Sequence, residues 1–475
     1  MFSKKTYIDR RQKLAALMPD SLLLFIGNDN APFNYAGNEY RFRQDSTFLY
    51  LFGLDTPGLA ATIDTAAGVS TLFADDVSMD DIVWTGPMPT AQDRAAEAGM
   101  DRAQPVASLA EVVRRAVAAG RKVHYVPPYR GDTTIRLAEL LGQTPAQVKA
   151  GVSEPLIRAL ISLRLVKEQC EIEDIDRQMA FGYNMHTAAM RLAYEGVTEN
   201  DIMSRLDFEA LRGGGAVSFP TICTIHGETL HNHGYIHPLE AGRLLLVDAG
   251  CESPNHYATD NTRTTPVGGR FTTRQREIYE IVLAANNAVV ENSKPGVFYR
   301  DMHLLACRTI IDGLKAVGIM KGDTDEALQA GAAGLFMPHG IGHNMGLDVH
   351  DMESYGEDLV GYDEETGPRS TQLGLGSLRM AKRLRPGNIV TDEPGIYFIP
   401  ELIDRWKASG HCADFVNFQR LESYKDFGGI RIEDDLLITE TGCRIMGDRR
   451  LPSTPAEVEA EALKGRDENR DILTQ

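Results

Sequence analysis

The sequence lacks the features that would associate it with a membrane or with nucleic acid. It contains no run of about 18 apolar residues, the minimum for a membrane-spanning helix. Basic residues are in the minority: 49 Lys and Arg stand against 67 Asp and Glu, which gives a net charge of −18. Nucleic acids and anionic membranes both require a positive face, so neither is expected as a partner.

Cysteine is also scarce, and its spacing indicates no metal or disulfide framework. Six cysteines are scattered over 475 residues without a CxxC pair. The segment MFSKKTYIDRRQKLAALMPD at the start lacks the apolar stretch of a secretory signal. Together these absences favour reduced thiols and a cytoplasmic location.

The first ~165 residues, by contrast, carry the pattern of an α/β unit within a chain long enough for two or three domains. Apolar segments of strand length are bounded by Gly, Asn, Asp or Pro, and two segments between them have helical composition. The predicted strands are 21–27, 46–54, 59–64 and 122–127, and the predicted helices are 91–100 and 108–120. Strands separated by helices predict a mixed or parallel sheet with helices packed against it.

A second domain is predicted to begin near LRLVKEQCEIEDIDRQMA, where a charged, helix-favouring stretch starts an amphipathic pattern that continues through Met190. We therefore assign residues 1–165 to one domain and 166–475 to the other. A further helix is predicted from Thr272, which forms a capping box with Gln275, to the stop signal at Pro295-Gly296. The tail after Pro452 is expected to form one short helix and then fray.

Chemistry is indicated at five separated positions in the second domain. They are Asp248 in VDAG, Asp260 in ATDNTRT, His343 in HGIGH, Glu393 in TDEPG and Glu433 in RIEDD. Four carboxylates and one imidazole form a hard ligand set that suits Mn²⁺ better than structural zinc. Two ions about 3.5–4 Å apart could share such carboxylates and hold a hydroxide between them. A single Asp before Ala-Gly is equally explained as a turn residue, so the ordered set of five carries the prediction of a two-metal hydrolase.

This set resembles the metallopeptidase family of aminopeptidase P, prolidase and methionine aminopeptidase, which share the pita-bread fold. The order matches, and so does the spacing except that Asp248 and Asp260 are one residue further apart than in many aminopeptidases P. The extra residue falls in CESPNHY, a predicted hairpin turn. The resemblance implies that Asp260 and Glu433 bridge both ions, that Asp248 serves one, and that His343 with Glu393 serves the other. Cys251, three residues after Asp248, is interpreted as a buried small residue instead of a ligand.

The resemblance extends to nearly the whole chain. The segment YRFRQDSTFLYLFGLDTPG resembles the N-terminal domain of aminopeptidase P and prolidase, which the short methionine aminopeptidases lack. The implied fold class is α/β (α+β), with an N-terminal creatinase/aminopeptidase-P-like α/β domain followed by a pita-bread catalytic domain.

Further residues acquire expected roles from the same family. Glu393 is the candidate for proton transfer, His231 and His350 are expected to line the cleft and hold the substrate, and Arg431 is expected to support the site. A lone histidine is more often a satisfied structural residue, and we prefer that interpretation for His339. For the histidines of the stretch 226–237, namely His226, His233 and His237, solvated loop positions are preferred over a second metal site.

Two residues bear on the substrate and on assembly. SLRMAKRLRPG resembles a prolidase segment whose first arginine, here Arg379, binds the terminal carboxylate of the substrate bidentately. A surface arginine is the plain alternative.

Trp84 resembles a tryptophan of the N-terminal domain that caps a neighbouring subunit's active site, and a core or interface anchor is its alternative. A homo-oligomer, dimer or higher, is therefore expected.

The implied function is that of an Xaa-Pro aminopeptidase, a proline-specific exopeptidase that uses two divalent ions. Mn²⁺ is favoured, with Co²⁺ or Zn²⁺ as alternatives, and the expected substrates are small peptides with proline at the second position. An Xaa-Pro dipeptidase (prolidase) is the alternative, because Arg379 and the insert between Glu393 and Glu433 resemble prolidase. We prefer the aminopeptidase because it does not require Arg379 to reach the substrate. A metal-free creatinase-like hydrolase or a binding protein is more remote, since such relatives depart at the ligand positions.

Overall fold

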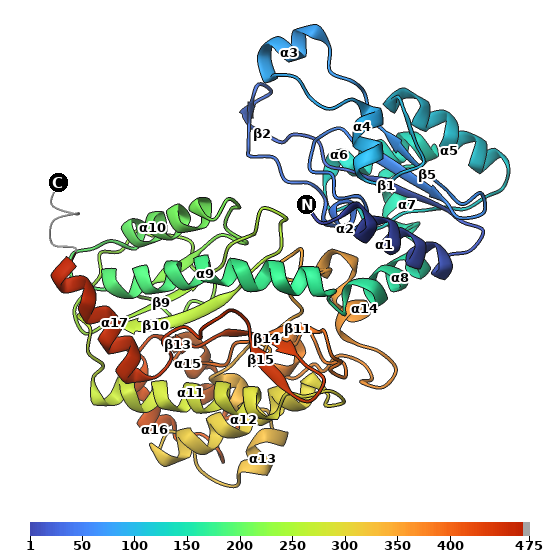
Figure 1. The fold of residues 1–475 in the computed structure, drawn as a ribbon. Helices are drawn as coiled ribbons and strands as arrows, with labels where there is room; N and C mark the ends of the chain where they lie inside the picture. Colours follow the sequence, from blue (N-terminus) through green and yellow to red (C-terminus); the bar gives the residue numbers. More distant parts are fainter. Residues whose placement is uncertain (469–475) are drawn as a thin grey trace. The chain divides into compact units, whose positions relative to one another are not determined.

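The structure, a computed structural model, describes residues 1–468, and their contacts divide into two compact units (Figure 1). The N-terminal unit comprises Met1–Arg164 with the short segment Met352–Gly356, and the C-terminal unit comprises Leu165–Asp351 and the chain from Glu357 onward. Among the helices described, none combines the length and hydropathy that a membrane crossing requires. The fraying predicted at the end of the chain concerns residues 469–475, which lie outside the described residues.

The N-terminal unit is built on a five-stranded sheet in the order β6-β5-β4-β1-β7. The pairs β1–β4 and β4–β5 are antiparallel, whereas β1–β7 and β5–β6 are parallel, so the sheet is mixed. The strands are β1 Leu22–Ile26, β4 Ala60–Asp64, β5 Val69–Phe73, β6 Arg102–Gln104 and β7 Val123–His124, and β2 Pro32–Tyr35 forms a separate hairpin with β3 Asn38–Glu39.

Helices cover both faces of this sheet. Successive side chains of β1 point to opposite sides, and apolar residues of β1 are buried on each side. Leu22 and Leu24 join a buried cluster with residues of α5 and α6, whereas Phe25 contacts Phe52 of α2, with ring centroids 5.7 Å apart. The helices are α1 Lys4–Leu17, α2 Ser46–Phe52, α3 Met79–Thr85, α4 Ala91–Glu97, α5 Leu109–Ala118, α6 Gly131–Leu141, α7 Pro145–Ala150 and α8 Glu154–Arg164.

The prediction of a strand at residues 46–54 was wrong, because this segment forms helix α2. Asp45 caps the helix by accepting a hydrogen bond from the backbone N–H of Phe48, and Gly53 ends it in the left-handed conformation. All residues of α2 are buried, so no polar face reveals the helical period. A short, wholly apolar run is compatible with either a buried strand or a buried helix.

The C-terminal unit packs short sheets between pairs of helices. Its sheets have the orders β10-β9-β8, β11-β14-β15 and β12-β13, and all their strand pairs are antiparallel. In Figure 1 the strands β9 and β10 lie between the helices α9 and α10 on one side and α11 and α12 on the other. The strands are β8 Ile222–Thr224, β9 Leu244–Ala249, β10 Asn261–Pro266, β11 Ile389–Asp392, β12 Gly395–Tyr397, β13 Gly429–Arg431, β14 Asp434–Ile438 and β15 Cys443–Ile445.

The helices of this unit follow the sequence patterns closely. They are α9 Gln169–Leu192, α10 Glu199–Arg212, α11 Thr273–Asn292, α12 Tyr299–Ala316, α13 Thr324–Gln329, α14 Glu357–Gly361, α15 Pro400–Ser409, α16 Phe418–Leu421 and α17 Pro455–Glu468. Helix α9 carries the amphipathic pattern predicted to run through Met190. Helix α11 begins at the predicted capping box, in which the Thr272 hydroxyl accepts from the Gln275 N–H and the Gln275 side chain accepts from the Thr272 N–H.

The capping box of α11 yields a stability prediction. Thr272→Ala removes the hydroxyl that satisfies an otherwise unpaired N–H, so we expect the free energy of unfolding of the C-terminal unit to fall by about 1 kcal/mol. Urea unfolding followed by circular dichroism measures the change. Thr272→Ser keeps the hydroxyl and is the matched control. Equal midpoints for the alanine and serine variants would contradict the assigned cap.

Candidate metal centre

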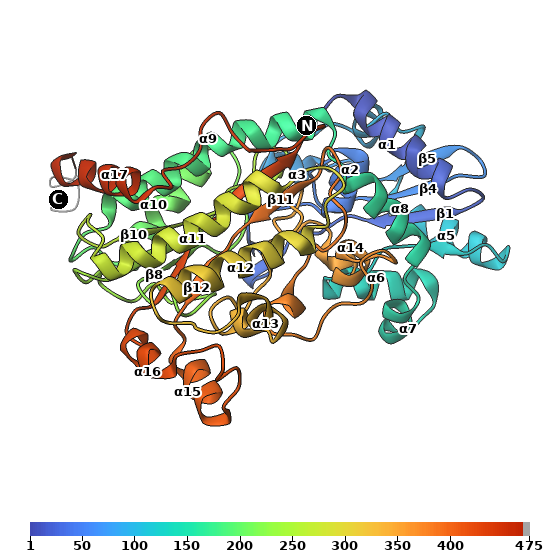
Figure 2. The same ribbon diagram turned by 90° about the horizontal axis from the view of Figure 1, so that it is seen from below.

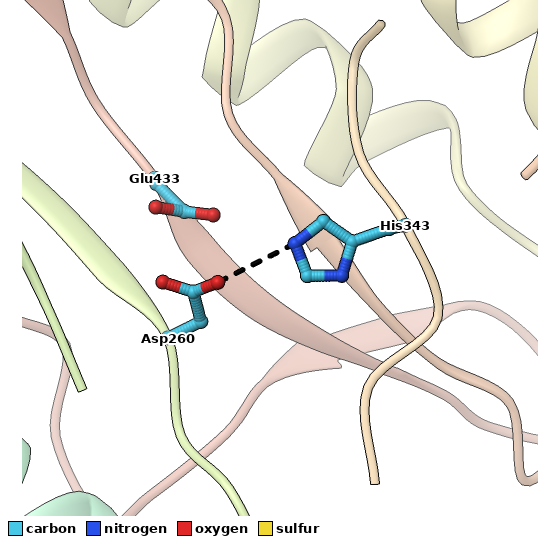
Figure 3. Close-up of side chains that lie close together, drawn as sticks. All are labelled: Asp260, His343 and Glu433. Carbon is cyan, nitrogen blue, oxygen red and sulfur yellow. Dashed lines mark ion pairs between the residues drawn. The ribbon is translucent and has the colours of Figure 1, made fainter. Parts of the chain in front are cut away.

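The five predicted metal ligands line one cavity of about 520 Å³ in the C-terminal unit. Asp260, His343 and Glu433 are the most closely gathered, since one ligand atom of each lies within 4.8 Å of the others. Figure 3 shows the Asp260 carboxylate facing the imidazole, with Asp260 Oδ2 3.4 Å from His343 Nε2. Asp248 and Glu393 line the same cavity.

The strands bring these carboxylates together by ending or breaking at the cavity. Asp248 lies in β9 opposite Thr262 of β10, and Asp260 immediately precedes β10. Thr262 also forms a β-bridge with Glu433, which falls in the break between β13 and β14. Glu393 falls in the break between β11 and β12, and these strands pair with β14 and β13 respectively. The two breaks therefore lie opposite each other and present Glu393 and Glu433 to one space.

Two glycines of the ligand motifs are required by close backbone contacts. A Cβ at Gly250 of VDAG would lie 1.8 Å from the Thr259 carbonyl oxygen, and one at Gly342 of HGIGH would lie 2.0 Å from that of Thr391. No side chain can occupy such a position, so glycine lets the segments that carry the ligands approach each other. The extra residue between Asp248 and Asp260 is accommodated in a turn closed by the bridge between Glu252 and Ala258, as predicted.

His343 is held in the tautomer that a metal ion requires. Its Nδ1 lies 3.0 Å from the carbonyl oxygen of Asn344, and a carbonyl can only accept, so Nδ1 carries the proton. The lone pair of Nε2 therefore faces Asp260 and Glu393, whose carboxylate oxygens lie 3.4 and 3.8 Å away. Orientation of a ligand histidine by a backbone carbonyl is the usual arrangement in metal sites.

The electrostatics of the cavity fit divalent cations. Burial raises the pKa of Asp260 and of Glu433 well above the ordinary values, and neighbouring carboxylates raise them further. Burial also raises the pKa of Glu393, against the opposing effects of His343 and Arg431. Oxygen Oδ1 of Asp248 and Oδ1 of Asp260 are buried without a hydrogen-bond partner among the described residues. Orphaned, mutually repelling carboxylate oxygens are compensated by bound cations of the hard class.

Arg431 donates hydrogen bonds to this carboxylate set and to two neighbouring hydroxyl groups. Its guanidinium donates to Asp248 Oδ2 at 2.6 Å, to the hydroxyl of Thr262 at 3.1 Å and to the hydroxyl of Tyr397 at 2.8 Å. The residue is only 3% exposed, so these three contacts hold a fixed positive charge against the ligand cluster.

His339 lies in the cavity wall, in a loop formed by residues 339–343. Nδ1 of His339 donates to the Gly340 carbonyl at 2.7 Å, and Nε2 accepts from the Tyr397 hydroxyl at 2.9 Å. Burial lowers the pKa of His339 to about 3 and raises that of Tyr397 to about 12. His339 is thus hydrogen-bonded as a structural histidine, but it also contributes to the cavity, which its place in the HGIGH motif could have indicated.

The remaining predicted site residues are distributed as follows. His231, His350 and Arg379 line the cavity, and the rings of His350 and His343 are 4.2 Å apart. Burial lowers the pKa of His231. The Arg379 side chain is 35% exposed and its Nε lies 3.4 Å from Glu357 Oε1. Trp84 belongs to the other unit, on α3, and is 86% exposed.

The histidine-rich stretch 226–237 contributes two histidines to the cavity, since His233 lines it together with His231. His226 lies beside Glu228 and packs its ring against that of His237. The apolar part of the cavity wall was not predicted, because its side chains belong to no recognisable sequence motif. These residues are Phe219, Pro220, Ile222, Leu230 and Val349.

Comparison with known families gives matches over both units. The model of metallopeptidase family M24 matches residues 173–440, and the model of the aminopeptidase P N-terminal domain matches residues 7–125.

Relatives of the full chain carry two different names. The Xaa-Pro dipeptidase of Homo sapiens is 31% identical over 472 aligned residues, which cover 96% of this chain and 92% of the relative. A probable Xaa-Pro aminopeptidase of Fusarium vanettenii is 32% identical over 88% of this chain and 86% of its own. The solved structure of Pseudomonas aeruginosa aminopeptidase PepP superposes with a TM-score of 0.80 at 28% identity, covering 98% and 99% of the two chains. Escherichia coli aminopeptidase P with the inhibitor Pro-Leu gives the same values.

The repulsion among the buried carboxylates predicts opposite stability effects with and without metal. We expect Mn²⁺ to raise the melting temperature of the wild-type protein. Asp260→Asn should fold and should bind metal at least about tenfold more weakly, because it loses a carboxylate ligand. In chelator its melting temperature should be no lower than that of the wild type, because one of the repelling charges is gone. Metal analysis and thermal melts measure both effects, with the exposed Asp414→Asn as control. Wild-type metal content in Asp260→Asn would contradict the assigned ligand.

Proposed function

We propose a specific reaction for this chain, which belongs to metallopeptidase family M24 and carries the aminopeptidase P N-terminal domain: hydrolysis of the peptide bond before a proline in second position. The chain is a hydrolase with the fold of the aminopeptidase P and prolidase enzymes. The observation that carries the proposal is the convergence of Asp248, Asp260, His343, Glu393 and Glu433 on one cavity.

These five residues would hold two divalent ions, with Asp260 and Glu433 between them, and Mn²⁺ is our first candidate because the donors are mostly hard oxygens. When bound, the ions lower the pKa of a water molecule toward neutrality and polarise the substrate carbonyl. The orphaned oxygens of Asp248 and Asp260 support this assignment.

The chain's own side chains position the peptide and move the proton. Glu393 is 21% exposed in the cavity and is the candidate that passes a proton to the leaving proline nitrogen. His231 and His350 are placed to hold the peptide. The apolar wall that includes Phe219 and Leu230 suits a proline ring, whose nitrogen carries no N–H when bonded in a peptide.

The position of Arg379 supports an Xaa-Pro dipeptidase as the finer assignment. A guanidinium in the cavity wall can bind the terminal carboxylate of an Xaa-Pro dipeptide, which is the carboxylate of the proline itself. The sequence alone favours the aminopeptidase, because that activity does not require Arg379 to reach the substrate. The similarity to the human Xaa-Pro dipeptidase over nearly the full length of both chains favours the same choice.

Xaa-Pro aminopeptidase remains the second candidate. It is supported by the superposition on aminopeptidase P structures, which cover 98% of this chain. An aminopeptidase accepts peptides that continue past proline, whereas a dipeptidase requires a carboxylate at that point.

Substrates that differ only at the terminal carboxylate distinguish the two assignments. We expect the metal-loaded enzyme to cleave Gly-Pro with a kcat/KM about 10- to 100-fold above that for Gly-Pro-amide, since a hydrogen bond to a charged group contributes about 1.5–3 kcal/mol. Arg379→Met should abolish this preference, and Gly-Pro-Leu should be a poor substrate. Steady-state kinetics provide the measurement.

Arg383→Met is the matched control, because Arg383 lies on the same loop, is 44% exposed and pairs with Glu365 away from the cavity. It should retain the preference for the free carboxylate. Rapid cleavage of Gly-Pro-Leu by the wild type would favour the aminopeptidase assignment. Cleavage of Gly-Ala at the same rate as Gly-Pro would contradict the proposed specificity for proline.

We further propose that the chain forms a homo-oligomer through the N-terminal unit. Helix α3 has no buried residue, although Met79, Val83 and Trp84 are large and apolar, with exposed fractions of 73%, 73% and 86%. An apolar helix face without a partner in its own unit is typical of an interaction surface. The resemblance of Trp84 to a tryptophan that caps a neighbouring active site supports the same assignment.

Truncation of Trp84 tests this assembly. Trp84→Ala should shift the population toward smaller species at a given concentration in sedimentation velocity, because it removes the largest exposed apolar side chain of α3. Ile135→Ala, which truncates an exposed apolar residue of α6, should leave the distribution unchanged. An unchanged distribution for Trp84→Ala would exclude the proposed interface.

A further inference from the structure

A second cavity, of about 330 Å³, lies in the C-terminal unit where α9 and α10 meet the end of α17. These helices lie together in Figures 1 and 2, and α9 contacts both of the others. Its lining is mostly polar and charged, unlike the apolar wall of the metal cavity. The residues that line it are Tyr183, Asn184, Thr187, Ala188, Arg191, Arg205, Glu209, Arg212, Arg449, Glu461 and Lys464.

The charge of this second cavity opposes that of the chain. Five cationic side chains and two carboxylates line it, which leaves an excess of three positive charges in a protein of net charge −18. The excess is local and lies in a concave surface, which concentrates the attraction for an anion. The cavity is therefore suited to an anion.

Two buried carboxylates hold most of the cations in place. Glu209, 4% exposed, accepts from Arg205 at 2.7 Å and from Arg212 at 2.6 Å. Glu461, 6% exposed, pairs with Arg191 at 2.5 Å and with Lys464 at 2.6 Å. Each carboxylate neutralises only one of its two partners, so each pair of cations retains one positive charge while its geometry is fixed.

Arg449 supplies the third excess charge. Its guanidinium carbon lies 3.5 Å from the centre of the Tyr183 ring, a cation–π contact, and among the described residues it has no carboxylate partner. Stacking orders the planar guanidinium and leaves its N–H groups at the ring's edge available as donors.

The cavity is formed before any ligand binds, because α17 packs directly on the α9 backbone. A Cβ at Gly465 would lie 1.9 Å from the carbonyl oxygen of Arg191, so the two helices are in contact at the residue next to Lys464. Hydrogen bonds from Lys464 and Arg191 hold the pKa of Glu461 below its ordinary value, although burial alone would raise it. Glu461 therefore remains charged and keeps Arg191 and Lys464 oriented.

We propose that this cavity binds a small phosphate-bearing anion with at least two negative charges. Several guanidinium groups on different elements match the several oxygens of a phosphate group, because two of these oxygens can accept the two parallel N–H groups of one guanidinium. A single carboxylate would leave two of the three excess charges unpaired. The site is separate from the metal cavity, with which it shares no lining residue in the described part of the chain.

Calorimetric titration of the full-length, metal-loaded protein with inorganic pyrophosphate tests the site. We expect saturable binding that weakens about tenfold or more in Arg449→Gln, because one charge-assisted donor is lost. Arg449 is exposed and leaves no buried carboxylate unpaired, so the variant should fold. Arg420→Gln, which removes another exposed arginine beside an aromatic ring, should bind as wild type does.

Pyrophosphate also binds divalent metals, so the metal centre must be separated from the second cavity. Binding at the metal centre would persist in Arg449→Gln and be lost in Asp260→Asn, and that outcome would overturn the proposal, as would the absence of saturable binding. The proposed site predicts the reverse. A parallel titration with ADP identifies the source of the phosphate: tighter binding than pyrophosphate indicates a nucleotide, and equal or weaker binding indicates the free anion.

Discussion

Carboxylates buried within reach of one another repel, and this constraint governs the C-terminal unit. Asp260 and Glu433 are 5% and 2% exposed, and burial together with their neighbours raises both pKa values. A fold that keeps such groups together must supply positive charge or give up stability. Arg431 supplies one charge and His343 supplies a neutral nitrogen, so the remaining compensation falls to bound cations. The strand breaks that gather the carboxylates therefore fit a metal site.

Features encoded in short stretches of sequence could be predicted. The ligand motifs lie within a few residues of the side chains they present, and the capping box of α11 needs only Thr272 and Gln275. The prediction of a strand at residues 46–54 was wrong for a related reason. The local pattern is apolar throughout, and the residues that cap the helix, Asp45 and Gly53, also suit the ends of a strand. Burial by other elements, which decides such cases, cannot be seen in the segment itself.

The cavity wall depends on contacts between distant residues and escaped prediction. Phe219 and Leu230 have no distinguishing motif, and the partner of His339, Tyr397, lies 58 residues away. The excess positive charge between α9, α10 and α17 is equally invisible in a sequence whose overall charge is −18. Residue type predicted the chemistry, whereas only the tertiary structure shows what surrounds it.

The hydrogen bonds of the wall also decide which arginine can meet a substrate. Arg431 can only donate and the Gly340 carbonyl can only accept, so the chain Arg431–Tyr397–His339–Gly340 has a single direction. Every proton in it is assigned, and Arg431, which is 3% exposed, donates to Asp248, Thr262 and Tyr397. Releasing Arg431 would leave the partly buried Asp248 carboxylate without this donor. Arg379, 35% exposed beside the partly exposed Glu357, can exchange its partner at far lower cost. Of the two arginines that line the cavity in the described chain, Arg379 is therefore the one that we propose as the ligand of a substrate carboxylate.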